Sequence, residues 1–184
     1  MTFERKIFHF FTLLVLVGSF AKAEVFTTAE SLTTGKMMIG FEGQANIDPD
    51  GARANGHFGY GVNNKWDLLL KAGVGSTNPM MGADLKYFIW KMAVFDLAVT
   101  GGAYYLKELF FELIPLATHK FKWLSLSAGA AFNLRTTDSV KLGTNIFGLI
   151  NLPFHKNLDL RAEAGLKLAN YYYNWVSAGV VYHY

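Results

Sequence analysis

Hydrophobic and polar residues alternate one by one through most of the chain after residue 36. The segment 158–168 is the clearest case, because one set of alternate positions consists entirely of Leu and Ala. The intervening positions carry Asp159, Arg161, Glu163, Gly165 and Lys167. Successive side chains of a β-strand point to opposite faces, so this period of two predicts strands with one apolar and one polar face.

Ten segments of this kind follow one another, separated by short turns. The succession predicts an all-β protein, a closed up-and-down antiparallel β-barrel of ten strands with short loops. Eight strands are the alternative, because the run 109–118 alternates poorly. The predicted strands are Lys36–Ile47, Ala54–Val62, Trp66–Gly75, Met81–Trp90, Ala93–Tyr104, Leu109–Thr118, Trp123–Arg135, Val140–Leu152, Leu158–Leu168 and Trp175–Tyr184.

The first 23 residues have a different pattern. A basic start (Arg5, Lys6) precedes an apolar run that ends at Ala21-Lys22-Ala23. This order is typical of a cleaved secretory signal peptide, and the apolar run is shorter than the roughly 20 residues of a membrane-spanning helix. The chain is therefore expected to divide into a signal peptide at 1–23, a polar lead-in at 24–35 and a barrel at 36–184.

Composition narrows the possible classes of protein. The chain has no cysteine, and charged residues make up 17% of it, against about 25% in typical soluble domains. No stretch after residue 23 contains 18 consecutive apolar residues. If this part of the chain crosses a membrane, a closed barrel is the form that satisfies its backbone hydrogen bonds. Part of the net charge of +3 lies in the signal segment, and no basic run indicates nucleic-acid binding.

Alternation alone does not decide which face of the sheet points inward. A soluble lipocalin-like barrel buries its apolar face, whereas a membrane barrel turns that face to the lipid. Two features favour the membrane: the apolar face carries almost no charge, and aromatic residues lie near strand ends, as in the interfacial girdles of membrane barrels. The expected girdle residues are Trp66, Trp90, Trp123, Tyr171, Tyr172, Trp175, Tyr182 and Tyr184.

The last ten residues form an alternating strand that ends on an aromatic side chain. In this ending, and in its secretory start, the chain resembles small bacterial outer-membrane β-barrel proteins. The resemblance implies an outer-membrane location, contact with membrane lipids, and recognition of the last strand by the barrel assembly machinery. We also expect both termini in the periplasm and a monomeric barrel. The assembly signal would comprise Val176, Ala178, Val180, Tyr182 and Tyr184.

If the polar face lines the lumen, acidic and basic side chains meet there in nearly equal numbers. This balance predicts mutual pairing inside a narrow barrel, since a buried charge needs a partner. A salt-bridge network that fills the interior and a narrow pore for ions or small solutes both remain open. The expected lumen charges are Glu42, Asp67, Lys71, Asp84, Lys86, Asp96, Glu112, Arg135, Asp159, Arg161, Glu163 and Lys167.

The sequence offers little support for enzyme chemistry. His119 and His155 lie in turns that carry lysine, and His57 has no Ser or Asp partner on its own strand. No His, Cys and Asp cluster has the spacing of a metal site, and no cofactor motif is present. The predicted function is therefore a small outer-membrane pore or structural envelope protein. A soluble periplasmic barrel that binds an apolar ligand and a lipid-modifying barrel enzyme are the alternatives.

Overall fold

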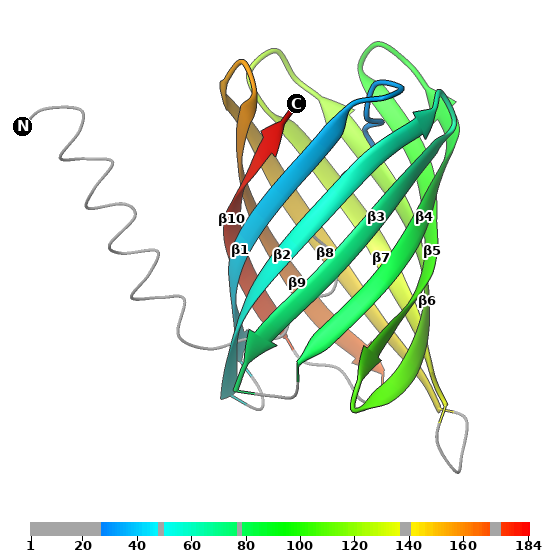
Figure 1. Ribbon diagram of the computed structural model, residues 1–184, viewed down its shortest axis with the longest axis vertical. Coiled ribbons are helices and arrows are strands. Elements are labelled where there is room, and N and C mark those ends of the chain that lie inside the picture. Colours follow the sequence, from blue (N-terminus) through cyan, green and yellow to red (C-terminus); the bar gives the residue numbers. More distant parts are fainter. Residues whose placement is uncertain (1–26, 48–49, 77–78, 137–140, 170–173) are drawn as a thin grey trace, which may run out of the picture.

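The computed structural model describes residues 27–47, 50–76, 79–136, 141–169 and 174–184, which form one closed antiparallel β-barrel (Figure 1). The predicted signal peptide lies outside the described residues. The strands are β1 (Met37–Ile47), β2 (Asp50–Asn63), β3 (Trp66–Gly75), β4 (Met80–Lys91), β5 (Phe95–Leu106), β6 (Glu108–Lys120), β7 (Ser125–Thr136), β8 (Lys141–His155), β9 (Leu158–Ala169) and β10 (Trp175–His183).

Each strand pairs with its neighbour in sequence, and β10 closes the barrel by pairing with β1. The closing register places Glu42 opposite Gly179 and Ile39 opposite Tyr182. Closure leaves neither edge of the sheet exposed, which removes the risk of edge-to-edge aggregation. The prediction of a ten-stranded up-and-down barrel is confirmed, and the eight-stranded alternative is wrong.

Two connections are shorter than the sequence suggested. Strand β2 begins at Asp50, which pairs with Ile47, so Arg53 belongs to the barrel wall and not to a loop. Strands β5 and β6 continue until Leu106 faces Glu108, with Lys107 alone between them. Lys107 has a φ of 66°, a left-handed conformation that allows this one-residue turn.

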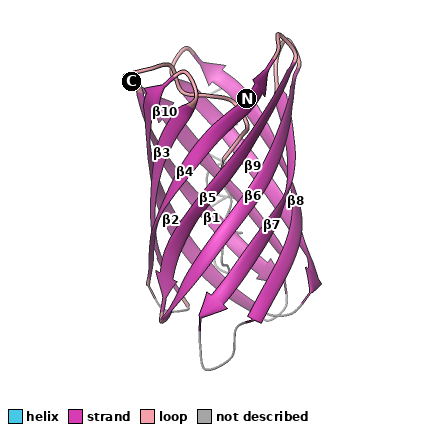
Figure 2. Cartoon of the chain, turned by 90° about the vertical axis from the view of Figure 1, so that its right-hand side faces the viewer, coloured by secondary structure: helices cyan, strands magenta, loops and turns pink. Residues whose placement is uncertain are grey.

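Figure 2 shows the strands tilted around a cylinder, with turns joining them at the end that is drawn uppermost. We call the end that carries Tyr184 and the β2–β3, β4–β5, β6–β7 and β8–β9 turns the upper rim, as it is drawn in Figure 1. The other end, reached by the last residues of β1, is the lower rim. The upper and lower halves of the lumen are named accordingly.

Burial alternates along the strands and settles which face points inward. On β3, Asp67 and Lys71 are buried, while their outward neighbours Trp66 and Leu70 are exposed. Large apolar side chains such as Phe41 and Val74, each 63% exposed, cover the outside of the barrel. This arrangement is the reverse of a soluble barrel and matches a lipid-facing exterior around a polar interior. The alternative of a soluble lipocalin-like barrel, with apolar residues inside and charges outside, does not fit this structure.

The interior also contains an apolar cluster. Strands β6 and β8, where apolar residues occupy both faces, turn Ile114, Leu116 and Phe147 inward. These side chains pack with Phe88, Ala98, Ala131 and Trp175. Along the described residues, no helix is long and apolar enough to cross a membrane.

Candidate functional site

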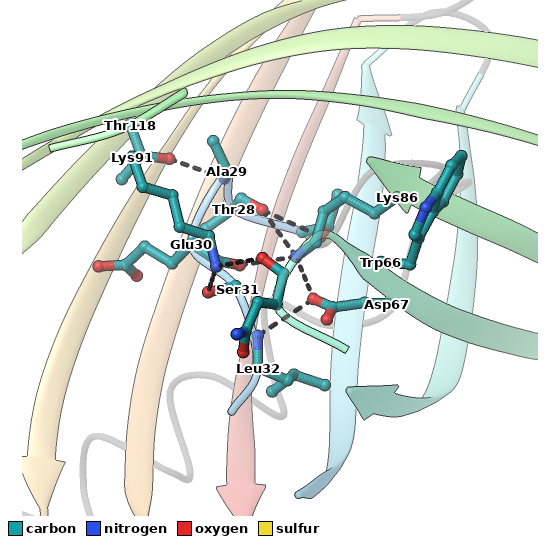
Figure 3. A network of polar contacts seen from close by, with 12 residues as sticks. Thr28, Ala29, Glu30, Ser31, Leu32, Trp66, Asp67, Lys86, Lys91 and Thr118 are labelled. Atoms are coloured by element: carbon teal, nitrogen blue, oxygen red, sulfur yellow. Dashed lines mark hydrogen bonds and ion pairs between the residues drawn. The ribbon is translucent and has the colours of Figure 1, made fainter. Parts of the chain in front are cut away.

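A short irregular segment of the chain lies inside the upper half of the lumen. It comprises residues 27–36, which precede β1, and we call it the plug segment (Figure 3). Thr27, Thr28 and Ala29 are almost completely buried, with Ala29 at 0% exposure. Residues 24–35 were expected only to lead into the first strand, and no feature of the sequence indicated that they fold into the barrel.

The side chain of Lys86, on β4, binds the main chain of the plug segment. Its Nζ donates hydrogen bonds to the carbonyl oxygens of Thr28, at 3.1 Å, and Glu30, at 2.8 Å. The same ammonium lies 3.2 Å from Oδ2 of Asp67, and that carboxylate oxygen accepts a hydrogen bond from the backbone N–H of Leu32 at 3.1 Å. A buried ion pair from two adjacent strands thus satisfies three backbone groups of the segment (Figure 3).

Other contacts fix the two ends of the plug segment. The N–H of Ala29 donates to Oγ1 of Thr118 at 2.8 Å, and the Ala29 methyl group joins the apolar cluster inside the barrel. Towards the upper rim, Lys91 donates to the hydroxyl of Ser31. Backbone hydrogen bonds tie Gly35 and Lys36 to Gly61 of β2. The segment is therefore attached to several strands without becoming a strand itself.

A cavity of about 490 Å³ lies between the plug segment and the barrel wall at the upper rim. Its wall residues include Lys36, Lys91, Lys120, Asp96 and Arg161. Lys120 pairs with Asp96 at 2.8 Å, so charges of both signs meet within the cavity. This volume is within the usual range of sites for small molecules, about 300–1,000 Å³.

A second ionic cluster lies near the middle of the lumen. Lys71 of β3 contacts both Asp84, at 3.2 Å, and Glu112. The ring of Tyr104 is 4.9 Å from the Lys71 ammonium and stacks on Phe110. One lysine therefore links carboxylates from β4 and β6 across the inside of the barrel.

Two histidines also have carboxylate neighbours. His57 of β2 lies 3.4 Å from Glu42 on the adjacent strand β1. His183 lies 3.0 Å from Asp159 at the upper rim. Asp159 also accepts a hydrogen bond from the side-chain amide of Asn151. The Oδ1 atom of Asn151 in turn accepts a hydrogen bond from Arg161. Among the described residues, no group of three or more His, Cys, Asp or Glu side chains is arranged to hold a metal ion.

The twelve side chains proposed to line the lumen can be located in this framework. Ten of them are buried or half-buried inside the barrel, and Arg135 pairs with Glu108 at the lower rim. Lys167 follows the inward alternation of β9 but is exposed near the lower rim. Arg53, which is 2% exposed inside the barrel, was not predicted because its position was assigned to a loop.

Outward aromatic residues surround the upper rim. Trp66, Trp90, Trp123, Tyr182 and Tyr184 are between 40% and 70% exposed. Tyr182 and Tyr184 contact one another edge to face, with ring centroids 4.8 Å apart. The expected girdle residues Tyr171 and Tyr172 lie outside the described residues.

Trp175 departs from the prediction and points into the lumen. It is 3% exposed, and its Nε1 donates a hydrogen bond of 2.7 Å to Glu163. The reason is the period of two in β10: because Val176 points outward, Trp175 must point inward. Gly165 lies opposite it on β9 and leaves space for the ring. Trp175 therefore does not belong to the girdle.

Comparison with known proteins identifies the fold. No protein-family model and no curated protein sequence matches the chain. Among solved structures, it is similar to an outer-membrane channel from Pseudomonas putida F1, described as COG4313, with a TM-score of 0.59, 10% identity, and coverage of 89% of this chain and 100% of the other. The chain has the fold of outer-membrane channels.

Two porin structures have the same fold. The NanC porin gives a TM-score of 0.55 at 7% identity, and the matched region covers 79% of this chain and 98% of the porin chain. The KdgM porin gives a TM-score of 0.50 at 12% identity, with coverage of 80% and 98%. At these identities, the likeness concerns the fold and not the solute.

Proposed function

We propose that this chain is a bacterial outer-membrane barrel that forms a narrow passage for ions and small solutes, closed near its upper rim by the plug segment. The observation that carries the proposal is how this segment is attached. Side chains of several strands hold residues 28–32, and the backbone bonds of Gly35 and Lys36 to Gly61 lie where the segment joins β1. Residues 28–32 can therefore leave the lumen without any strand pair being broken. The channel fold and the apolar exterior support the same function.

The surroundings of the barrel follow from its surface. The exposed Leu, Val, Ile and Phe side chains would contact membrane lipid, and the aromatic residues of the upper rim would lie at the headgroup level. We place the upper rim on the periplasmic side, where the two ends of the mature chain are expected. The plug segment would then close the passage from the periplasm.

A reversible cross-link tests whether the passage runs through the plugged lumen. The chain has no cysteine, so the pair Ala29→Cys and Thr118→Cys would create a unique disulfide. The two positions are in contact, because the Ala29 N–H lies 2.8 Å from Thr118 Oγ1. In planar bilayers we expect discrete conductance steps to disappear on oxidation and to return when a reductant is added.

The single variant Ala29→Cys is the control, since it cannot form the cross-link. Equal conductance of the paired variant in both redox states would place the ion path outside the plugged lumen and contradict the proposal. A silent bilayer in both states would favour a second function, a structural envelope barrel with a permanently filled interior. That alternative has support in the burial of Ala29 against the apolar cluster.

We further propose that the last strand is recognised by the outer-membrane assembly machinery and that the barrel is a monomer. Val176, Ala178, Val180 and Tyr182 share the outward face of β10, and the exposed Tyr184 follows the last residue of the strand. Replacing Tyr182 and Tyr184 by Ser should reduce the amount of heat-modifiable barrel in the outer membrane. Tyr60→Ser, an outward tyrosine on β2, is the control, and an equal loss with that variant would contradict a role specific to the last strand.

A further inference from the structure

The lower half of the lumen contains a group of uncharged polar side chains that no ion pair explains. Gln44, Asn133, Asn145 and Ser177 are at most 6% exposed. Their seven side-chain nitrogen and oxygen atoms have no hydrogen-bond partner among the described residues. Buried polar groups are nearly always hydrogen-bonded in native proteins, so such a concentration of unpaired groups requires another partner.

The four side chains lie on one side of the barrel, on β1, β10, β8 and β7. Gln44 faces Ser177 in the register of β1 and β10. Asn145 faces Ala131, and Asn133 faces Gly143, so the two asparagines are diagonal neighbours on β8 and β7. We call these four residues the amide arc.

Aromatic side chains lie between the two ends of the amide arc. Trp175 and Phe147 both face Gly165 of the intervening strand β9. The absence of a side chain at Gly165 makes room for the indole, since a Cβ atom there would lie 2.1 Å from the Trp175 ring. The wall on this side therefore places the amide groups next to aromatic rings that are buried in the apolar cluster.

The wall of the amide arc also carries the buried Glu163, which faces Ser177 and accepts the hydrogen bond of Trp175, whereas the opposite wall carries Lys71. There Lys71 is engaged by Asp84 and Glu112, so its charge is compensated within the protein. Carboxamides carry no net charge and both donate and accept hydrogen bonds. They match hydroxyl groups and neutral amides, whereas they offer no compensating charge to an ion taken out of water.

We infer that the amide arc is a binding subsite for a small uncharged solute rich in hydroxyl groups, such as a neutral sugar, as it passes through the barrel. The inference rests on the proposed pore function and names its solute class. Hydroxyl groups of the solute would pair with Gln44, Asn133, Asn145 and Ser177.

Three related sugars separate charge from shape: glucose is neutral, glucuronate is anionic and glucosamine is cationic. Saturation-transfer NMR on the detergent-solubilised full chain would measure their binding without requiring transport. We expect glucose to bind best. The double variant Asn133→Leu/Asn145→Leu should weaken glucose binding by about fivefold or more, the effect of losing one or two ordinary hydrogen bonds. Thr144→Val, an adjacent outward position, is the control and should bind glucose as the natural chain does.

The outcomes distinguish this inference from the proposed function. Stronger binding of either charged sugar, or glucose binding that is unchanged in the double variant, would overturn the inference. So would a lack of binding of all three sugars, which would mean that the amide arc holds water only. Heat-modifiability on a gel verifies that the double variant is folded, and Gln44→Leu repeats the test from another strand. Proteoliposome flux of the same sugars tests the pore separately, because binding without flux would leave the inference standing and refute the passage.

Discussion

The two halves of the lumen differ in how their buried polar groups are satisfied. In the upper half, Lys86 with Asp67 and Lys120 with Asp96 form ion pairs, and the first pair also binds the plug segment. In the lower half, Glu163 is bonded to Trp175, but the neutral side chains of the amide arc have no partner among the described residues. The upper half holds a piece of its own chain, whereas the unpaired groups of the lower half are those that we propose to bind a solute.

The largest effect is expected from Lys86→Met. The change removes the cation that holds Asp67 and two carbonyl oxygens of the plug segment, and it leaves a buried carboxylate without its ion-pair partner. Breaking one partner of a buried pair typically costs about 3–5 kcal/mol. Urea unfolding in detergent or lipid, followed by the gel shift, would measure this loss.

The double variant Asp67→Asn/Lys86→Met is the control, because it removes both charges. It should recover much of the stability and still leave the plug segment loosely held, with more frequent conductance openings than the natural chain. If Lys86→Met alone costs less than about 1 kcal/mol, which is the value of an exposed pair, the upper half is not built around this contact.

A smaller effect is expected from Gly165→Val in the lower half. The new side chain would compete with the Trp175 indole for the same space and break the hydrogen bond to Glu163. Overpacking of this kind usually costs about 1–3 kcal/mol. Unfolding curves and the tryptophan emission spectrum would report the two changes. Gly148→Val is the matched control on β8, since its Cβ would face outward with its nearest neighbour at 3.9 Å.

Trp175 also shows what the sequence can and cannot predict. The period of two determined the face of nearly every strand residue, because alternate residues of a strand share one face and only one of the two sets can line the lumen. The prediction for Trp175 is wrong because an aromatic residue near a strand end joins a girdle only if the alternation of its strand turns it outward, and Trp175 is 3% exposed. The facing Gly165, which accommodates the ring, becomes a neighbour only once the strand register is known.

The plug segment could not be predicted for a different reason. Lys86 binds it through the carbonyl oxygens of Thr28 and Glu30, and every residue type supplies a carbonyl oxygen. Residues 27–36 therefore need no periodic pattern to be recognised by the barrel. The ionic partners across strands, such as Lys71 with Glu112, also depend on barrel shear and could be predicted only as a balance of charges.

The comparison between the two halves is tested most directly by replacing Asn with Leu at two positions of β8, one in each half of the lumen. Asn151 in the upper half donates to Asp159 and accepts from Arg161, so Asn151→Leu should cost about 1–3 kcal/mol of unfolding free energy. Asn145 in the lower half has 0% exposure and no partner for either polar atom among the described residues. Asn145→Leu should therefore leave the barrel as stable as before or more stable, because it removes a buried amide that the fold does not use.

The measurement is the urea midpoint of each variant in the same lipid. If both variants lose stability equally, Asn145 is a structural residue like Asn151, and the lower half has no group reserved for a solute. If only Asn151→Leu loses stability, the amide at position 145 is maintained at a cost to the fold, which is the relation between stability and function expected of a binding site.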